Sequence, residues 1–474
     1  MKILLIHPPA INMITTNVPC FADKETGFYP PLGLLYVASY LKKHTDNEVQ
    51  ILDAQVEQLN YEQIEERIRY FEPEVVGIQM MTFTLIDALL CAQLVKKIDP
   101  EIKVVAGGPH PNIYIQETIA KPEIDIIVLG EGEEVFCQLI NALTDRKSLH
   151  GIAGIVFKEN GKVFASDSKG FIKNLDELPF PDRTLIPYKK YYSLLARHQT
   201  FTTMVSSRGC PYRCLFCDRA YYGKLYRMRS PENVVQEMEE CLRLGIEEID
   251  FQDDIFTLKK ERVLNICDLI IKKGLQIKWN VRSRIDTIDE ELLAKMKQAG
   301  CQRIYYGIEA GTKKILDVLR KHINLDKAVE IVGITRAKGI SSLAYFIIGS
   351  PEETREDILA TIVYMRRLNP DFVHIAIMTP FPATDLYSLG LEKGLYQEDY
   401  WQKFSLNPSR DFVPRIWDEL ISRDELEKLL KIAYHSFYMR PGYIFQELLK
   451  IKTLKEFNRK VKAGIRTLLY TKGN

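Results

Sequence analysis

The stretch Arg208-Gly209-Cys210-Pro211-Tyr212-Arg213-Cys214-Leu215-Phe216-Cys217 decides how the rest of the chain is interpreted. Its three cysteines follow a C-x3-C-x2-C spacing, directly after the β-type run at residues 201–205. Three thiolates on one short loop suit three irons of a [4Fe–4S] cluster, and the fourth iron then has no protein ligand. The stretch therefore predicts an iron–sulfur cluster with one open coordination position.

Two other uses of three cysteines remain open at this point. A structural zinc site needs four tetrahedral ligands, usually in two separated pairs. No second cysteine pair follows the triplet, and the nearest histidine upstream is His198. The other alternative is a cluster that serves only as an electron relay.

The motif also resembles the signature of the radical S-adenosylmethionine (SAM) enzymes, in which an aromatic residue, here Phe216, precedes the third cysteine. The resemblance implies that SAM binds the open iron through its amino and carboxylate groups. It further implies that an electron from the cluster splits SAM into methionine and a 5′-deoxyadenosyl radical.

Length and composition set the frame for this interpretation. A chain of 474 residues is too long for one ordinary core, so we expect two or three domains. The 64 Lys and Arg against 63 Asp and Glu leave a net charge of +1, which argues against a nucleic-acid partner. The other six cysteines are scattered without framework spacing, as expected for reduced thiols in the cytoplasm. Neither a signal peptide nor a membrane span is expected from the hydropathy pattern.

Residues 1–150 alternate apolar strands with amphipathic helices. Strands are expected at residues 3–6, 49–52, 75–78, 104–106 and 124–129, and helices at 34–43, 61–70, 85–98 and 133–143. Continuous apolar strands alternating with helices predict a parallel sheet covered on both faces. The pattern favours an α/β, flavodoxin-like doubly wound domain, whose ligands bind at the carboxyl ends of the strands.

Small and polar residues follow the third, fourth and fifth of these strands. Glycines at such positions let the backbone approach a bulky ligand closely. The arrangement resembles the cobalamin-binding domain that precedes the radical SAM domain in one large subfamily, as does the Pro-Pro-Leu-Gly-Leu segment at residues 30–34. By that resemblance, the residues that line cobalamin and the cleft for its nucleotide tail are Thr82, Gly107, Gly108, Gly130, Glu131 and Gly132.

One feature of many cobalamin domains is missing. Their D-x-H-x-x-G motif supplies a histidine below cobalt, but residues 53–57 hold no histidine. The radical SAM branch commonly lacks the motif too, so the resemblance implies cobalt without a histidine ligand. His110 is the candidate substitute, against the alternative that it caps a turn or contacts the edge of the cofactor. A flavodoxin-like domain without a ligand is the alternative for the whole region.

Residues 151–200 form a connector, with a hairpin turn at Asn160-Gly161 and a proline-punctuated linker at 178–183. Six strand–helix units follow over residues 201–385, with strands expected near 201–205, 247–251, 277–281, 303–308, 344–348 and 372–378. They predict the partial (β/α)6 barrel of radical SAM enzymes. Functional groups in such barrels cluster at the C-terminal ends of the strands.

Matching the family's positions gives the strand-end residues of this barrel roles in binding SAM. Cys210, Cys214 and Cys217 would bind the cluster, while Asp253 and Asp254 would meet the SAM amino group. Arg284 would pair with the SAM carboxylate, Glu309 would hold the ribose hydroxyls, and Glu353 would lie in the loop near the adenine. The ordinary alternative for a single carboxylate is a helix N-cap or a surface ion pair. No catalytic side chain is assigned.

Residues 386–474 are expected to form a helical C-terminal region, with a helix over 419–438. In residues 450–472, Lys and Arg accompany one acidic residue, Glu456, and apolar residues recur at helical spacing. Such a helix can lie on an anionic membrane surface, which would place the protein at the inner face of the membrane and favour a lipid-like substrate. The alternative is a terminal helix that packs on the protein.

The resemblance covers nearly the whole chain and predicts a cobalamin-dependent radical SAM enzyme. The expected reaction is methylation of an unactivated carbon of a small or lipid-like molecule, with flavodoxin or ferredoxin as the electron donor. Both domains would then face one shared cavity. The alternatives are radical cyclisation, ring contraction or oxidation without methyl transfer, and a non-catalytic cobalamin- or SAM-binding protein.

Overall fold

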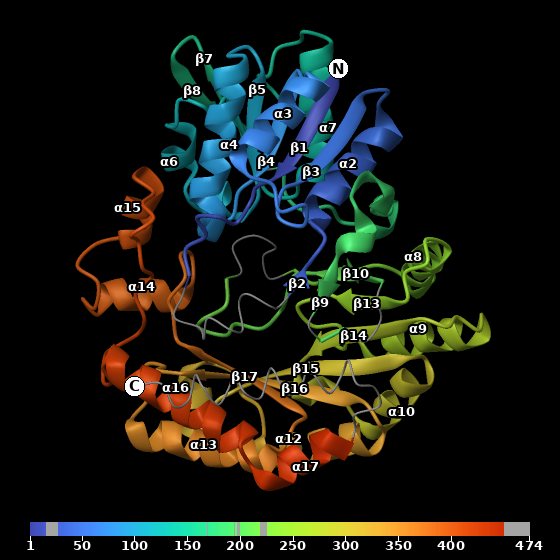
Figure 1. Cartoon of the computed structure of the whole chain (residues 1–474), viewed down its shortest axis with the longest axis vertical. Coiled ribbons are helices and arrows are strands. Elements are labelled where there is room, and N and C mark those ends of the chain that lie inside the picture. The colour runs from blue at the N-terminus through green and yellow to red at the C-terminus, as the bar shows by residue number, and fades with distance from the viewer. Residues whose placement is uncertain (16–26, 168, 194, 197–199, 219–224, 450–474) are drawn as a thin grey trace.

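Two sheets, one above the other in Figure 1, organise the computed structural model. The described residues are 1–15, 27–167, 169–193, 195–196, 200–218 and 225–449. The segment 450–472, interpreted above as a basic amphipathic helix, lies outside them, as do Cys20 and His198. No helix in the described part of the chain is long and apolar enough to cross a membrane.

The upper sheet has the strand order β3-β1-β4-β5-β6-β7-β8. Its strands are β1 (Lys2–His7), β3 (Glu48–Asp53), β4 (Val75–Gln79), β5 (Lys103–Gly107), β6 (Ile126–Val128), β7 (Ile155–Glu159) and β8 (Lys162–Ala165). The first five pair in parallel in the order second, first, third, fourth, fifth along the chain. This is the flavodoxin order, so the predicted fold class is confirmed.

Helices cover both faces of the upper sheet because its strands are apolar on both sides. In β1, Ile3 and Leu5 pack in one core and Leu4 and Ile6 in another. Helices α2 (Leu32–His44) and α7 (Gly132–Thr144) pack together on the first side. Helices α3 (Tyr61–Phe71) and α4 (Leu85–Ile98) cover the second side.

The hairpin β7–β8 extends the upper sheet beyond residue 150. β7 pairs antiparallel with β6, and β8 pairs antiparallel with β7. Asn160 and Gly161 form the two-residue turn with φ of 51° and 73°, the positive values that such a hairpin turn requires.

The lower sheet has six strands, all parallel, in chain order. They are β10 (Phe201–Met204), β13 (Glu248–Phe251), β14 (Lys278–Ser283), β15 (Cys301–Glu309), β16 (Ser341–Ile348) and β17 (Phe372–Ile377). The helices between them are α8 (Pro231–Arg243), α9 (Lys260–Lys272), α10 (Glu290–Gln298), α11 (Lys313–Val318), α12 (Leu325–Ala337) and α13 (Arg355–Leu368). This confirms the predicted partial (β/α)6 barrel.

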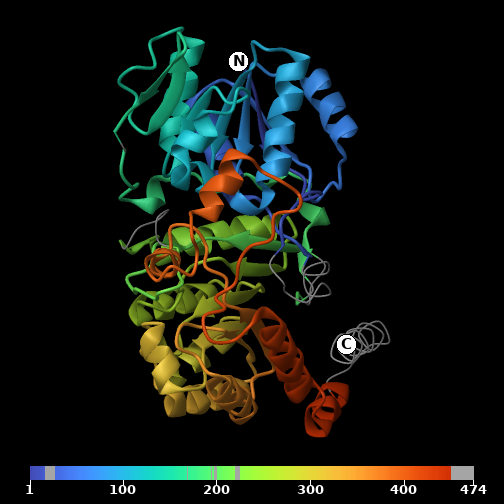
Figure 2. The same cartoon turned by 90° about the vertical axis from the view of Figure 1, so that its left-hand side faces the viewer.

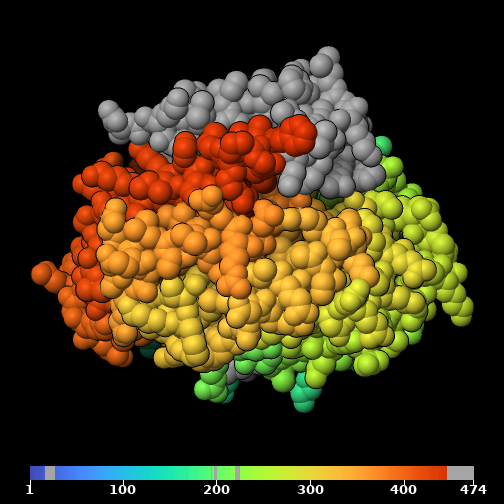
Figure 3. All heavy atoms as spheres, turned by 90° about the horizontal axis from the view of Figure 1, so that it is seen from below, coloured from blue at the N-terminus to red at the C-terminus, as the bar shows by residue number. Residues whose placement is uncertain are grey.

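The C-terminal helices contact both sheets. Helix α16 (Arg423–Tyr438) packs along β17, and its Tyr434 hydroxyl lies 3.1 Å from the backbone nitrogen of Ile375. Helix α17 (Pro441–Leu449) follows it, and Figure 3 shows these helices beside the barrel at the lower end of the molecule.

Between the barrel and α16, the chain returns to the upper sheet. After α14 (Asp385–Glu392), the short helix α15 (Tyr400–Leu406) places Trp401 and Phe404 in the core beside α4. The Gln402 amide also donates to Glu117 of α6 (Ile115–Ile119) at 2.6 Å. Figure 2 shows this orange segment rising from the barrel to the upper domain.

Candidate functional site

The cysteine loop stands on a short two-stranded stem at the end of β10. The stem pairs β11 (Ser207–Arg208) antiparallel with β12 (Arg227–Met228). The loop is fixed to the barrel at Leu215, whose N–H donates to Leu319 at 3.1 Å and whose carbonyl accepts from Leu386 at 2.9 Å. Cys210, Cys214 and Cys217 therefore lie at one mouth of the barrel.

Their arrangement bears on the kind of metal they suit. Among the described residues, no three Cys, His, Asp or Glu side chains converge to hold a single metal ion. A structural zinc ion takes four ligands, whereas the cysteine loop offers three thiols. A [4Fe–4S] cluster binds each thiolate through a different iron, so its ligands stand farther apart. The three free thiols on one loop fit such a cluster.

Arg284 follows β14 and reaches the cysteine loop. Its guanidinium lies 3.8 Å from the ring centroid of Tyr212, which belongs to that loop. It donates to Asp286 at 2.8 Å and to the carbonyl of Lys321 at 2.9 Å. Its Nη1 is buried without a partner among the described residues, so one donor is left for an anionic ligand.

Glu309 ends β15 at a bulge, with an unusual positive φ of 72°. Its carboxylate accepts from Lys321 at 2.8 Å, and both side chains are 8% exposed. A Cβ added at Gly307 would meet this ion pair, so the pair lies across the inner side of β15. The sequence did not predict Lys321 as a site residue, because no motif marks it.

The two neighbouring aspartates after β13 differ in their surroundings. Asp253 is fully buried, and its carboxylate accepts from the Ser206 backbone at 2.7 Å and from the Ser206 hydroxyl at 2.6 Å. It thereby orders the chain just before the cysteine loop. Asp254 instead lines a cavity of about 270 Å³ between the two domains.

Glu353 organises its own loop after β16. One carboxylate oxygen accepts from the backbone N–H groups of Gly349 at 2.6 Å and Ser350 at 2.8 Å. The other oxygen is buried without a partner among the described residues. Burial raises the pKa of Glu353 from 4.5 to about 7, although these two hydrogen bonds lower it.

This pKa predicts a pH-dependent stability. Because the folded-state pKa exceeds the unfolded value, the unfolded chain binds fewer protons between pH 4.5 and 7. The free energy of unfolding should therefore fall by about 3 kcal/mol as the pH rises through this window, and this contribution should be flat above it. Glu353→Gln should remove that part of the slope in urea unfolding at pH 5 and 8. The control is Glu352→Gln at the exposed neighbouring residue, which should keep the pH dependence of the natural chain. Equal pH dependence in all three proteins would show that Glu353 is not its source.

A second cavity of about 270 Å³ lies at the carboxyl ends of the upper strands. Of the six residues expected to meet cobalamin, it is lined by Gly107, Gly108, Gly130, Glu131 and Gly132. A Cβ added at Gly107 would meet nothing within 4 Å, which leaves space for a ligand against this backbone. Gln79, missed from the sequence, also lines the cavity, and its Oε1 has no partner among the described residues.

Thr82 and His110 lie apart from the lining of this cavity. The Thr82 hydroxyl and His110 Nδ1 are 3.1 Å apart, and His110 is 1% exposed. Burial lowers the pKa of His110 to about 3, so its ring is neutral. The ring also packs against Tyr114, with centroids 5.5 Å apart.

Buried ion pairs join the cobalamin-side loop to the cysteine-side stem. Arg208 of β11 contacts Glu131 at 2.9 Å and Glu133 at 2.5 Å, and Arg227 of β12 contacts Glu131 at 2.7 Å. All four side chains are at most 7% exposed. The pKa of Glu131 is lowered because the charge-assisted bonds from Arg227 and Arg208 outweigh its burial. We call this group the interdomain ion-pair cluster.

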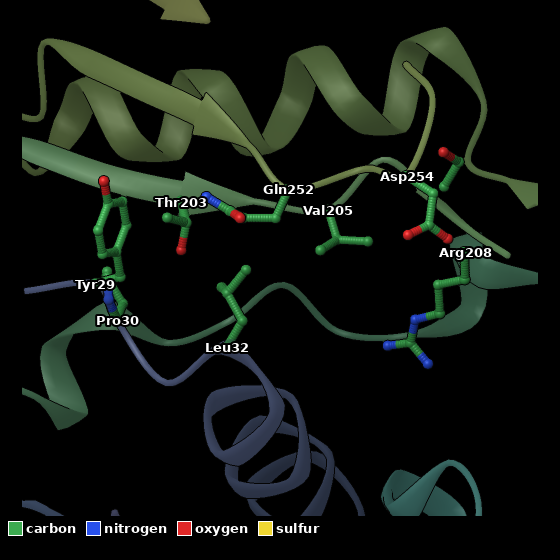
Figure 4. Close-up of a pocket in the computed structure, with 9 residues that line it drawn as sticks. Tyr29, Pro30, Leu32, Thr203, Val205, Arg208, Gln252 and Asp254 are labelled. Atoms are coloured by element: carbon green, nitrogen blue, oxygen red, sulfur yellow. The ribbon is translucent and has the colours of Figure 1, made fainter. Parts of the chain in front are cut away.

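The two cavities share three lining residues. Leu32, Val205 and Arg208 line both of them. Figure 4 shows Leu32 of the upper domain facing Val205 and Gln252 of the barrel across the first cavity. The space at the carboxyl ends of the upper strands therefore lies next to the space at the mouth of the barrel, with Leu32, Val205 and Arg208 between them.

Comparison with known proteins agrees with this geometry. The B12 binding domain family matches residues 21–140, and the Radical SAM superfamily matches residues 204–365. The chain is 37% identical over 451 residues to an uncharacterized methyltransferase of Pyrococcus horikoshii, across 94% of this chain and 95% of that protein. The chain belongs to the cobalamin-dependent radical SAM enzymes.

This radical SAM enzyme is also similar to a cyclase and to a solved structure. It is 29% identical over 469 residues to the anaerobic magnesium-protoporphyrin IX monomethyl ester cyclase of Rubrivivax gelatinosus, across 96% of this chain and 81% of the cyclase. Its fold is similar to that of the cobalamin-dependent SAM radical enzyme OxsB with aqua-cobalamin bound. That likeness has a TM-score of 0.76 at 17% identity and covers 99% of this chain and 72% of OxsB. The cofactors of the family are a [4Fe–4S] cluster, SAM and cobalamin.

Proposed function

We propose that this enzyme methylates an unactivated carbon of a small molecule. The observation that carries the proposal is that the two cavities are neighbours and share Leu32, Val205 and Arg208 in their linings. A carbon held at that junction would be open to both cofactors at once. The Pyrococcus horikoshii relative is named as a methyltransferase, which supports this reaction type.

The cofactors carry the reactive groups, and the protein binds, orients and shields them. When bound, the cluster and SAM supply a carbon-centred radical, and cobalamin supplies a methyl group. Cys210, Cys214 and Cys217 would hold the cluster, and Arg284 offers its free Nη1 to the SAM carboxylate. Gly107, Gly108 and Gly130–Gly132 would form the cobalamin cradle.

We propose the remaining SAM contacts from the positions of the side chains described above. Asp254 would receive the SAM amino group, with Asp253 holding its loop. Glu309 would meet the ribose hydroxyls while Lys321 fixes its carboxylate. Glu353 would keep the loop near the adenine in place through its two backbone bonds. A one-electron donor of the flavodoxin or ferredoxin class would reduce the cluster.

A radical cyclisation is the second candidate function. It is favoured by the similarity to the cyclase of Rubrivivax gelatinosus, which spans 96% of this chain. The two candidates differ in their product, because only methyl transfer adds a carbon atom. Mass spectrometry of the product with methyl-labelled SAM distinguishes them.

Cobalamin retention tests the proposed function directly. An added Cβ at Gly107 meets nothing within 4 Å, so Gly107→Phe should project its ring into the cradle. After anaerobic reconstitution and desalting, the natural chain should hold about one cobalamin and about four irons. The variant should keep its iron but lose the cobalamin absorption, because the ring occupies the cradle.

The control is Gly333→Phe, on the exposed side of α12, where an added Cβ also meets nothing within 4 Å. It should retain both cofactors. Full iron without cobalamin in the natural chain would refute methyl transfer and leave a cobalamin-independent radical reaction.

A further inference from the structure

The strands of the barrel have two chemically different faces. One alternating set packs against the helices in the main core; it includes Ile249, Val281, Ile304, Phe346 and Ile375. Successive side chains of a strand point to opposite faces. The residues between them therefore face the concave interior.

The interior set forms a continuous polar and aromatic floor across five strands. Asp250 of β13 pairs with Arg282 of β14 at 3.2 Å, and the Arg282 guanidinium lies 5.2 Å from the ring centroid of Tyr305. The Tyr305 and Tyr345 rings are stacked at 6.3 Å, and Tyr345 meets His374 edge-on at 5.6 Å. We call these five residues the barrel floor.

The barrel floor connects to the cavity between the domains. Gln252 lines that cavity and donates from Nε2 to Asp250 at 2.8 Å. Thr203, beside it in Figure 4, is 1% exposed, and its hydroxyl has no partner among the described residues. The Oδ1 of Asp250 is also buried without a partner there. Buried polar atoms are normally satisfied, so these two point to a ligand with hydrogen-bonding groups.

Arg282 offers the most specific contact on the floor. Both of its hydrogen bonds to described residues leave from Nη1, to Asp250 and to the carbonyl of Phe251. The side chain is 30% exposed. Its Nε–Nη2 edge therefore remains available within the described structure, and this edge of a guanidinium matches a planar carboxylate with two parallel hydrogen bonds.

The row of residues above the floor is filled on one side and open on the other. The Glu309–Lys321 ion pair occupies the space at Gly307, whereas Ala376, two residues after His374, carries little side-chain bulk. A flat ring can lie on this open side against Tyr345 and His374, which are partly exposed, because aromatic faces favour offset stacking. An aliphatic chain would gain no such geometry from four neighbouring planar groups.

We propose that the barrel floor selects a substrate with a carboxylate on an aromatic or conjugated ring, held by Arg282 and stacked against Tyr345. The proposal names the substrate class for the proposed radical reaction and rests on that function only for the chemistry that follows binding. The carboxylate anchors one end of the substrate deep in the barrel. The other end then extends toward the junction of the cavities.

The experiment compares 4-fluorobenzoate with the neutral 4-fluorobenzamide by ¹⁹F NMR titration of the reconstituted enzyme with SAM. These probes are among the smallest that carry the two groups, so their size does not limit entry. The carboxylate should bind about tenfold more tightly than the amide, as expected for a charge-assisted bidentate contact. Arg282→Gln should abolish this preference. The charge-balanced double variant Asp250→Asn/Arg282→Gln should abolish it too, which separates the result from misfolding around an unpaired buried aspartate.

The control is Arg243→Gln, which removes an exposed guanidinium outside the barrel and should leave the preference unchanged. Equal affinities of the two probes, no binding of the carboxylate up to millimolar concentration, or an unchanged preference in both Arg282 variants would overturn the proposal. Because the measurement needs no turnover, its outcome is independent of cobalamin retention. An enzyme that retains cobalamin but ignores the carboxylate would keep the proposed reaction and refute only this substrate class.

Discussion

Replacing Cys214 with alanine is expected to abolish cluster assembly and, with it, all radical chemistry. The cysteine loop offers three thiolates to the cluster, so losing one leaves two irons without a ligand from this loop. Iron analysis after anaerobic reconstitution should fall from about four atoms per chain to less than about one. Formation of 5′-deoxyadenosine from SAM under reducing conditions should fall to background.

The matched control is Cys241→Ala. Cys241 is fully buried in the main core on α8, away from the cysteine loop. Its replacement should cost about 1 kcal/mol of stability through lost packing and leave the iron content unchanged. A Cys214→Ala protein that retained four irons and cleaved SAM would refute the assignment of the cluster ligands.

Replacing Arg208 with methionine is expected to have the second largest effect, because it breaks the interdomain ion-pair cluster. Glu133 loses a guanidinium at 2.5 Å, and Glu131 keeps Arg227 and the backbone N–H of Ile172. Removing one partner of a buried ion pair typically costs about 3–5 kcal/mol, since the remaining charge is buried and unpaired. Urea unfolding followed by tryptophan fluorescence should report this loss, because Trp401 lies in the upper core and Trp279 in the barrel core.

Hydrogen exchange supplies the local readout for this variant. The amides of α7 near Glu133 and those of the β11–β12 stem should exchange faster, while the far side of the barrel should not change. Arg320→Met is the control, since Arg320 pairs with Asp385 at the surface and its loss should cost less than about 1 kcal/mol. A stability loss for Arg208→Met no larger than for Arg320→Met would show that the cluster does not hold the domains together.

Local patterns were sufficient to predict five strands of the upper sheet and the six strands of the barrel, whereas the hairpin β7–β8 was expected in the connector and instead extends the upper sheet. The strands of the upper sheet are apolar on both faces, as in β1, and helices cover both sides. The strands of the barrel alternate instead, as in β14, where Trp279 and Val281 face the helices and Asn280 and Arg282 face inward. This period of two was present in the sequence, and it marks the concave side of the barrel.

Contacts between segments that are distant in the chain could not be predicted from the sequence. Arg208 and Glu131 are 77 residues apart, and their pairing depends on how the two domains stack. Likewise, Lys321 meets Glu309 because the chain after α11 turns back across the barrel mouth. Nothing in the short helix α15 predicts that Trp401 packs on the upper sheet, since its apolar face would suit either domain. These residues are specified by tertiary packing, which a single sequence does not encode as a local pattern.

The return of the chain at α15 limits how the enzyme can open. In Figure 1 the two domains are bridged on one side by the connector around β9 (Tyr192–Ser193) and on the opposite side by α15. Two separated bridges leave rotation about the line that joins them as the least restricted motion of one domain against the other. The interdomain ion-pair cluster adds a third connection, so domain separation for substrate entry must also break its buried ion pairs.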